Sequence, residues 1–151
     1  MEKDFFAQEI EAHGGMMYRV AFTILRNGDH CKDALQEAAL KAWEKRRSLR
    51  DERCFTAWLT RILINECYNI RRKNRRIISL EEAPEQSSPP PDPTLALALK
   101  ALPEKLRLPL VLHFAEGMNE AEIAKVLHLN HSTVRGRIYR AKQQLRKELE
   151  A

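Results

Sequence analysis

The sequence has no apolar run of about 18 residues, which is the length a helix needs to cross a membrane. Its amino-terminal segment, MEKDFFAQEIEAHGG, carries too many charges to be a signal peptide. The three cysteines, Cys31, Cys54 and Cys67, stand far apart and form no CxxC pair. A disulfide framework or structural zinc site is therefore not expected, and we interpret them as buried thiols of a cytoplasmic protein with no membrane insertion.

Motifs of catalysis are missing as well. The few glycines form no phosphate-binding loop, and neither an HExxH metal motif nor a GxSxG nucleophile motif occurs. An enzyme acting on nucleic acid would need clustered acidic side chains or a metal site, and neither is visible. We therefore predict a protein that is not an enzyme, with no catalytic residues, no metal and no cofactor.

The balance of charge alternates in sign along the chain, whose overall net charge is +5. Residues 1–44 carry a net charge of −3, residues 45–76 of +8, residues 77–93 of −4 and residues 94–151 of +4. Two separated basic blocks indicate two contacts with a polyanion such as nucleic acid. The acidic amino-terminal block indicates a surface for a different partner, such as a protein.

Apolar residues recur at spacings of three and four along most of the chain, which predicts amphipathic helices and an all-α fold. The expected helices cover residues 3–13, 16–26, 30–45, 55–76, 93–102, 104–116 and 120–127, followed by a last helix that Ser132 caps. In the carboxyl-terminal half, the expected buried side chains include Leu95, Leu99, Leu102, Phe114, Leu145 and Leu149. Pro109 predicts either a kink or a helix that begins near Leu108.

Residues 77–93 differ from the rest of the chain in composition. They hold five of the seven prolines and four acidic residues, a mixture that cannot build a packed core. We predict that this segment is a flexible linker between two small helical domains, residues 1–76 and residues 94–151.

The segment 55–76, FTAWLTRILINECYNIRRKNRR, carries two stripes on one expected helix. One stripe is apolar, from Phe55 to Ile70, and would pack on other helices. The other stripe consists of Arg61, Asn65, Asn69, Arg72 and Arg76. Asparagine can bond a base edge and arginine can pair with phosphate or stack on a base, so this face is typical of a nucleic-acid reader. From the segment alone, a solvated basic helix end is an equal alternative.

Two neighbouring segments add to this pattern. The loop 46–54 contributes four arginines beside the polar stripe and would attract phosphates. On the preceding helix, DALQEAALKAW places Asp33, Gln36 and Glu37 together on one outward turn, where a merely solvated helix usually mixes in lysine. A solvated acidic face remains the alternative for these three residues.

The carboxyl-terminal third has the pattern of a helix-turn-helix. Asn119 and Glu122 are spaced as a capping box for a short helix, and a tight turn leads to a second helix whose buried stripe begins at Val134. The opposite side of that second helix carries Thr133, Arg135, Gly136, Arg137, Tyr139, Arg140 and Lys142. Cap, turn, buried spacing and charge agree, so we expect this helix to enter a DNA groove.

Four segments, in this order, resemble the extracytoplasmic function (ECF) group of bacterial RNA polymerase sigma factors: DALQEAALKAW, FTAWLTRILINECYNIRR, LPEKLRLPLVLHFAEGMNEAEIAKVL and STVRGRIYRAKQQL. The resemblance covers nearly the whole chain. It implies that Asp33, Gln36 and Glu37 bind the clamp helices of the polymerase beta-prime subunit. It further implies that the loop 46–54 captures a flipped non-template base of the minus-10 element and that the 55–76 helix reads it.

For the last two segments, the resemblance implies region 4 of a sigma factor, which binds the minus-35 element and the beta flap. The minus-35 contacts would fall on Arg135, Gly136, Tyr139 and Arg140, with Thr133 and Arg137 near phosphates. Gly136 stands where many relatives have a hydrogen-bonding side chain, often serine, so that contact departs from the pattern. The expected partners are core RNA polymerase, promoter DNA and an anti-sigma factor.

A different class of function remains open at this point. The protein could be an autonomous helix-turn-helix regulator whose residues 1–76 form a sensor or dimerisation domain. Such a regulator would bind duplex DNA without polymerase, and a second basic reading face would be unnecessary. The resemblance favours recruitment of polymerase and melting of promoter DNA, in which captured bases offset the few kcal/mol that unstacking costs.

Overall fold

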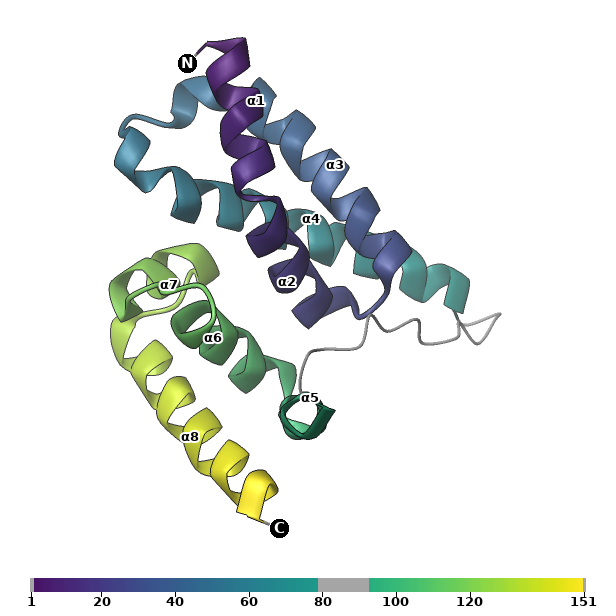
Figure 1. Ribbon diagram of the computed structural model, residues 1–151, viewed down its shortest axis with the longest axis vertical. Coiled ribbons are helices and arrows are strands. Elements are labelled where there is room, and N and C mark those ends of the chain that lie inside the picture. Colours follow the sequence, from purple (N-terminus) through teal and green to yellow (C-terminus); the bar gives the residue numbers. More distant parts are fainter. Residues whose placement is uncertain (1, 79–92, 151) are drawn as a thin grey trace. The chain divides into compact units, whose positions relative to one another are not determined.

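The computed structural model describes residues 2–78 and 93–150, and for residues 76–78 and 93 it describes only the backbone. The chain divides into two compact units, Met1–Ser87 and Ser88–Ala151 (Figure 1). All regular elements in the described residues are helices, so the predicted all-α fold with two helical domains is confirmed. The predicted linker, residues 77–93, lies almost wholly outside the described part.

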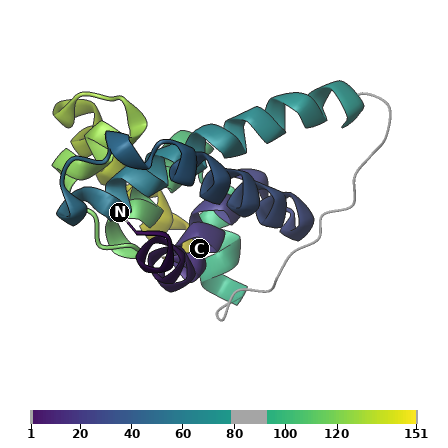
Figure 2. The same ribbon diagram turned by 90° about the horizontal axis from the view of Figure 1, so that it is seen from above.

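The first unit is built on three helices that pack on one another: α2 (Gly14–Leu25), α3 (Gly28–Glu44) and α4 (Phe55–Ile78). They meet through the apolar faces that the helical spacing predicts, and the shared core consists of Met17, Val20, Ala21, Cys31, Ala34, Ala38, Leu59, Leu63 and Cys67. Small alanines on α3 let that helix lie close to its two neighbours. The last turns of α4 extend beyond the amino-terminal end of α3, as two perpendicular views agree (Figures 1 and 2).

An aromatic cluster closes the end of the first unit where α4 begins. Helix α1 (Lys3–Ala12) contributes Phe6, whose ring lies 5.1 Å from Trp43 and 6.4 Å from Phe55, measured between centroids. Between α3 and α4 the chain makes two short 3-10 turns, η1 (Arg46–Ser48) and η2 (Glu52–Cys54). Cys31 and Cys67 are buried as predicted, but the prediction for Cys54 is wrong, because η2 leaves this residue exposed just before α4 enters the core.

The second unit consists of α5 (Pro93–Ala101), α6 (Glu104–Phe114), α7 (Glu120–Leu127) and α8 (His131–Glu150). Helix α8 packs against the other three, and its Ala141 joins Leu102, Leu106 and Leu110 in a buried cluster. Helix α6 begins at Glu104 and contains Pro109, so the later start near Leu108 is wrong, and the alternative of a kink at Pro109 stays a prediction. The proline ring is buried in the core, which offsets the lost backbone hydrogen bond.

Two further expectations for the second unit are corrected. Asn130, and not Ser132, caps α8: its Oδ1 accepts the backbone N–H of Thr133 at 2.9 Å and the Ser132 hydroxyl at 3.0 Å. Three leucine or phenylalanine side chains that were expected in the core are exposed, namely Leu95, Phe114 and Leu149. Together they line an open apolar groove of about 800 Å³ formed by α5, α6 and α8.

Candidate nucleic-acid interface

The outer face of α3 presents the acidic and polar residues that the sequence singles out. Asp33, Gln36 and Glu37 are all exposed, opposite the buried alanines of the same helix. Leu40 lies one further turn along and is 60% exposed, an exposed apolar side chain that the sequence analysis did not single out. An apolar side chain ringed by polar ones is typical of a protein-binding surface. The sequence could have indicated this exposure of Leu40, because Leu40 lies outside the buried stripe of α3.

The predicted reading stripe of α4 faces solvent along one side of that helix. Arg61, Asn65 and Arg72 are exposed and Asn69 is half-buried, whereas Leu59, Leu63 and Cys67 on the opposite side are buried. The structure therefore brings four of the five predicted readers onto one face. Arg76, the fifth, belongs to α4 by its backbone, but its side chain lies outside the described residues.

A polar chain of contacts links this face to the interior of the first unit. The Arg72 guanidinium donates to Asn69 Oδ1, and Asn69 Nδ2 donates to Glu66 Oε1 at 3.5 Å. Glu66 also accepts from Lys41 Nζ of α3, and this hydrogen bond raises the pKa of Lys41. Sequence analysis missed Glu66 and Lys41, because nothing in either helix alone indicates that they meet.

The loop 46–54 is held by contacts to the adjoining helices. The Arg46 guanidinium lies 4.0 Å from the centre of the Trp43 ring and donates to the Trp43 carbonyl at 2.8 Å. Trp58 of α4 donates its indole N–H to Ser48 Oγ at 3.0 Å. Arg53 pairs with Asp51 and lowers the pKa of that carboxyl. Arg46 is thus stacked on a ring, and the charge of Arg53 is partly neutralised by Asp51. Arg47 and Arg50 are exposed.

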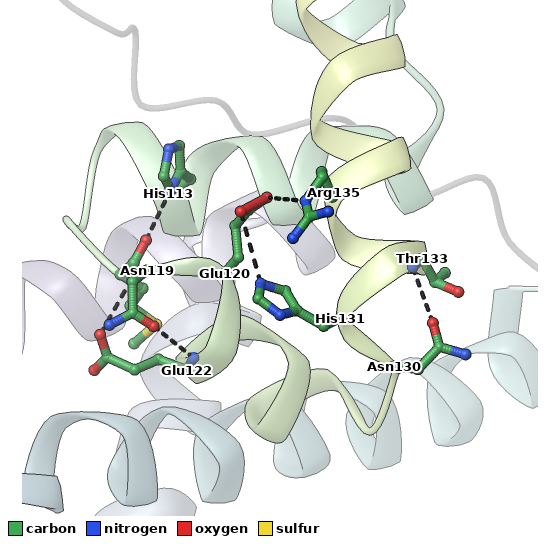
Figure 3. Close-up of polar contacts among 9 residues, drawn as sticks. His113, Asn119, Glu120, Glu122, Asn130, His131, Thr133 and Arg135 are labelled. Atoms are coloured by element: carbon green, nitrogen blue, oxygen red, sulfur yellow. Dashed lines mark hydrogen bonds and ion pairs between the residues drawn. The ribbon is translucent and has the colours of Figure 1, made fainter.

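Side-chain caps mark the start of each helix of the predicted helix-turn-helix, α7 and α8. Asn119 and Glu122 form the predicted capping box, with Asn119 Oδ1 accepting the Glu122 N–H at 2.8 Å and Glu122 Oε1 accepting the Asn119 N–H at 3.2 Å. His128 ends α7 in the left-handed conformation, with φ of 56°. Asn130 caps the start of α8 through the Thr133 N–H, so both helices of the motif begin at a side-chain cap (Figure 3).

The solvent side of α8 carries the predicted DNA-reading residues. Arg135, Tyr139 and Arg140 are exposed, while Thr133, Gly136 and Arg137 are partly buried. A side chain at position 136 would place its Cβ 3.3 Å from the Arg140 guanidinium. Gly136 therefore leaves room for Arg140 to lie back along the helix.

Glu120, at the start of α7, contacts two side chains of α8, His131 and Arg135. Its carboxylate lies 3.6 Å from Arg135 Nε and 3.6 Å from His131 Nε2 (Figure 3). These groups are largely exposed, so the attraction is modest and screened by salt. Sequence analysis missed this pairing, because it depends on the angle between two helices.

The two units match two parts of one protein family. Residues 10–77 match the model of Sigma-70 region 2, and residues 94–145 match that of Sigma-70, region 4. The ECF RNA polymerase sigma factor SigM of Mycobacterium tuberculosis is 30% identical over 93% of this chain and 74% of its own length. The chain belongs to the ECF group of sigma-70 factors.

Other relatives agree with this assignment. The RNA polymerase sigma factor SigV of Bacillus subtilis is 28% identical over 93% of this chain and 88% of its own. The solved structure of RpoE from Bartonella quintana, in complex with the anti-sigma factor NepR, has a TM-score of 0.83, 26% identity and 99% coverage of both chains. CnrH, solved with the cytosolic domain of CnrY, has a TM-score of 0.75, 27% identity and coverage of 99% of this chain and 90% of its own.

As an ECF sigma factor, the protein directs core RNA polymerase to begin transcription at promoters. An autonomous regulator is not favoured, because the first unit matches a sigma region and not a sensor domain. The roles of individual residues remain predictions. Among the described residues, no helix is long and apolar enough to span a membrane, and no three potential metal ligands gather at one place.

Proposed function

We propose that this sigma factor works through three surfaces: the outer face of α3 binds the beta-prime clamp helices, the polar stripe of α4 melts and reads the minus-10 element, and the solvent side of α8 reads the minus-35 element. The observation that carries this proposal is that each unit has its own exposed cationic reading face opposite a buried apolar face. An autonomous duplex-binding regulator would need only the face on α8.

The α4 stripe suits single-stranded DNA. Asn65 and Asn69 offer amide groups for base edges, and Arg61 and Arg72 flank them with positive charge. The loop 46–54 adds Arg47 and Arg50 for the backbone of a displaced strand. Holding an extruded base there offsets the few kcal/mol that unstacking costs, so binding is coupled to opening.

The solvent side of α8 suits duplex DNA. Arginine can pair bidentately with guanine in the major groove, and Arg135 and Arg140 are both exposed on this side. Tyr139 is 64% exposed between them and offers a ring for apolar contact with a base. Thr133 and Arg137, which are partly buried at the edges of this surface, are placed to bind phosphates.

Protein partners are expected on two further surfaces. The apolar groove lined by Leu95, Phe114 and Leu149 suits an amphipathic helix, and we assign it to the beta flap. An anti-sigma factor would act by covering one or more of these surfaces, since RpoE, which shares this fold, has been solved in complex with the anti-sigma factor NepR. Binding to core polymerase and promoter DNA places the protein in the cytoplasm. Its work is recruitment and melting, without bond-breaking chemistry.

The test is transcription by sigma-free core polymerase supplemented with the purified protein on genomic DNA. Initiation at defined start sites is expected, each preceded by two shared sequence elements. The variant Glu37→Lys should lower the affinity for core polymerase while its melting temperature stays close to that of the parent, because Glu37 is exposed. Promoter binding of equal strength with and without core polymerase would contradict the proposal.

A further inference from the structure

Glu66 is a buried carboxylate that neither the core nor the proposed reading stripe accounts for. It is 5% exposed, and among the described residues it is one of three buried polar or charged side chains. Burying a carboxylate is unfavourable unless it is paired and hydrogen-bonded. Its neighbours one turn away on α4 include Ile62, Leu63 and Ile70, so a leucine or methionine at this position would continue the apolar stripe without that cost.

The ion pair with Lys41 compensates the buried charge of Glu66, but it does not explain why a charged residue occupies this position. Replacing a buried ion pair by apolar side chains of similar size is often neutral or stabilising. Lys41 is also partly exposed, which weakens the attraction further. Stability of the α3–α4 packing is therefore an insufficient account of this pair.

The contacts of Asn69 supply a different account. Its Oδ1 accepts from the Arg72 guanidinium, and its Nδ2 faces Glu66 Oε1. With the amide reversed, a donor would meet the guanidinium and an acceptor would meet the carboxylate, so only one orientation satisfies both neighbours. The chain of contacts thus runs from the buried Glu66 through the half-buried Asn69 to the exposed Arg72.

We propose that Glu66 is a positioning residue of the sigma factor: from the interior it fixes the amide of Asn69, and through it Arg72, in the orientation that receives an extruded promoter base. This inference rests on the proposed function of α4 as the melting face. The side chain that meets DNA is then preorganised, and less conformational freedom is lost when the base is captured.

The test measures open-complex formation by holoenzyme on a duplex promoter. In the double variant Lys41→Met/Glu66→Met, the pair is replaced by apolar side chains of similar length, so the melting temperature and core affinity should stay close to those of the parent. Opening should slow about tenfold, as expected when contacting groups of one network are uncoupled. Glu66→Gln keeps an oxygen that accepts from both neighbours and should recover most of this loss. Glu44→Gln, which removes an exposed carboxylate also acting on Lys41, is the matched control and should open normally.

The decisive comparison repeats the double variant in an Asn69→Ala background. If Glu66 acts through Asn69, the further slowing there should be less than about twofold. Slowing of the same size in both backgrounds, or no slowing in the parent, would overturn the inference while leaving the proposed function intact. If Asn69→Ala together with Asn65→Ala opens promoters at the parental rate, the proposed melting face itself is wrong, and the role of Glu66 falls with it.

Discussion

The two proposed reading faces of this sigma factor differ in what holds their side chains. On α4, Asn69 and Arg72 are linked to a buried carboxylate and through it to another helix. On α8, Arg135 pairs with Glu120 at 3.6 Å, largely in solvent. The first arrangement fixes a side chain before DNA arrives, which suits a flipped base with one allowed pose. The second leaves arginines able to adjust to a groove and to phosphates.

The largest effect is expected from Asn65→Ala/Asn69→Ala on α4. Closed-complex formation and minus-35 binding should stay near normal, but opening of duplex promoters should slow about 100-fold or more, because the unstacking cost of a few kcal/mol is no longer offset. Stopped-flow detection of open complexes measures this. A template with a pre-melted bubble should recover part of the activity, and a bubble that gives no recovery would assign melting to the loop 46–54 alone.

Alkaline pH should separate the stabilities of the two units. Burial raises the pKa of the Cys31 thiol to about 11 from 9.0. The folded state then keeps a proton that the unfolded state loses, so about 2–3 kcal/mol of stability present below pH 9 should be lost as pH rises toward 11. The raised pKa of Lys41 acts in the same direction at still higher pH.

Fluorescence isolates this effect, because both tryptophans, Trp43 and Trp58, belong to the first unit. Denaturant unfolding followed by tryptophan emission should show the loss, and Cys31→Ala should flatten it. A pH profile that is unchanged in Cys31→Ala would mean that another group causes the decline.

A smaller and more selective effect is expected on α8. Arg140→Ala should cost about 1–3 kcal/mol in minus-35 binding and relax the preference at one base pair if Arg140 reads a base. Binding titrations of holoenzyme on native and scrambled upstream elements measure both quantities. Equal losses on every sequence would instead assign Arg140 to a phosphate.

The smallest effect concerns Gly136. Gly136→Ala should stabilise α8 by about 0.5–1 kcal/mol, because glycine is unfavourable inside a helix. The added Cβ at 3.3 Å should also displace the Arg140 guanidinium and change minus-35 selectivity. The melting temperature should therefore rise, while the preference among upstream elements changes for a separate reason, the displacement of Arg140. Higher stability with unchanged selectivity would show that Arg140 does not need the space.

Helical periodicity predicted both the fold and the faces on which the candidate readers lie. The helical spacing of apolar residues determines which side chains of a helix face the core and which face solvent. It could not predict contacts between helices, such as Lys41 with Glu66 or Glu120 with Arg135, since these depend on packing angles. It also assigned Phe114 to the core by spacing, although this side chain is 59% exposed with Lys142 Nζ 4.8 Å above its ring. The sequence offered both Asn130 and Ser132 as caps for α8, and periodicity could not decide which of the two side chains accepts the free backbone N–H.

The packing of α3 on α4 has a consequence for how the protein is made. Phe6 can pack only after Trp43 and Phe55 have been synthesised. The core between α3 and α4 likewise includes Cys67, so it cannot form until the chain has been made to that residue. At ribosomal rates of about 5–20 residues per second, α3 therefore emerges seconds before the helix that completes its fold. A chain interrupted before α4 would have no folded surface for polymerase. With the proposed roles of α3 and α4, an incomplete translation product would not occupy core enzyme unless it also carried the helix assigned to DNA opening.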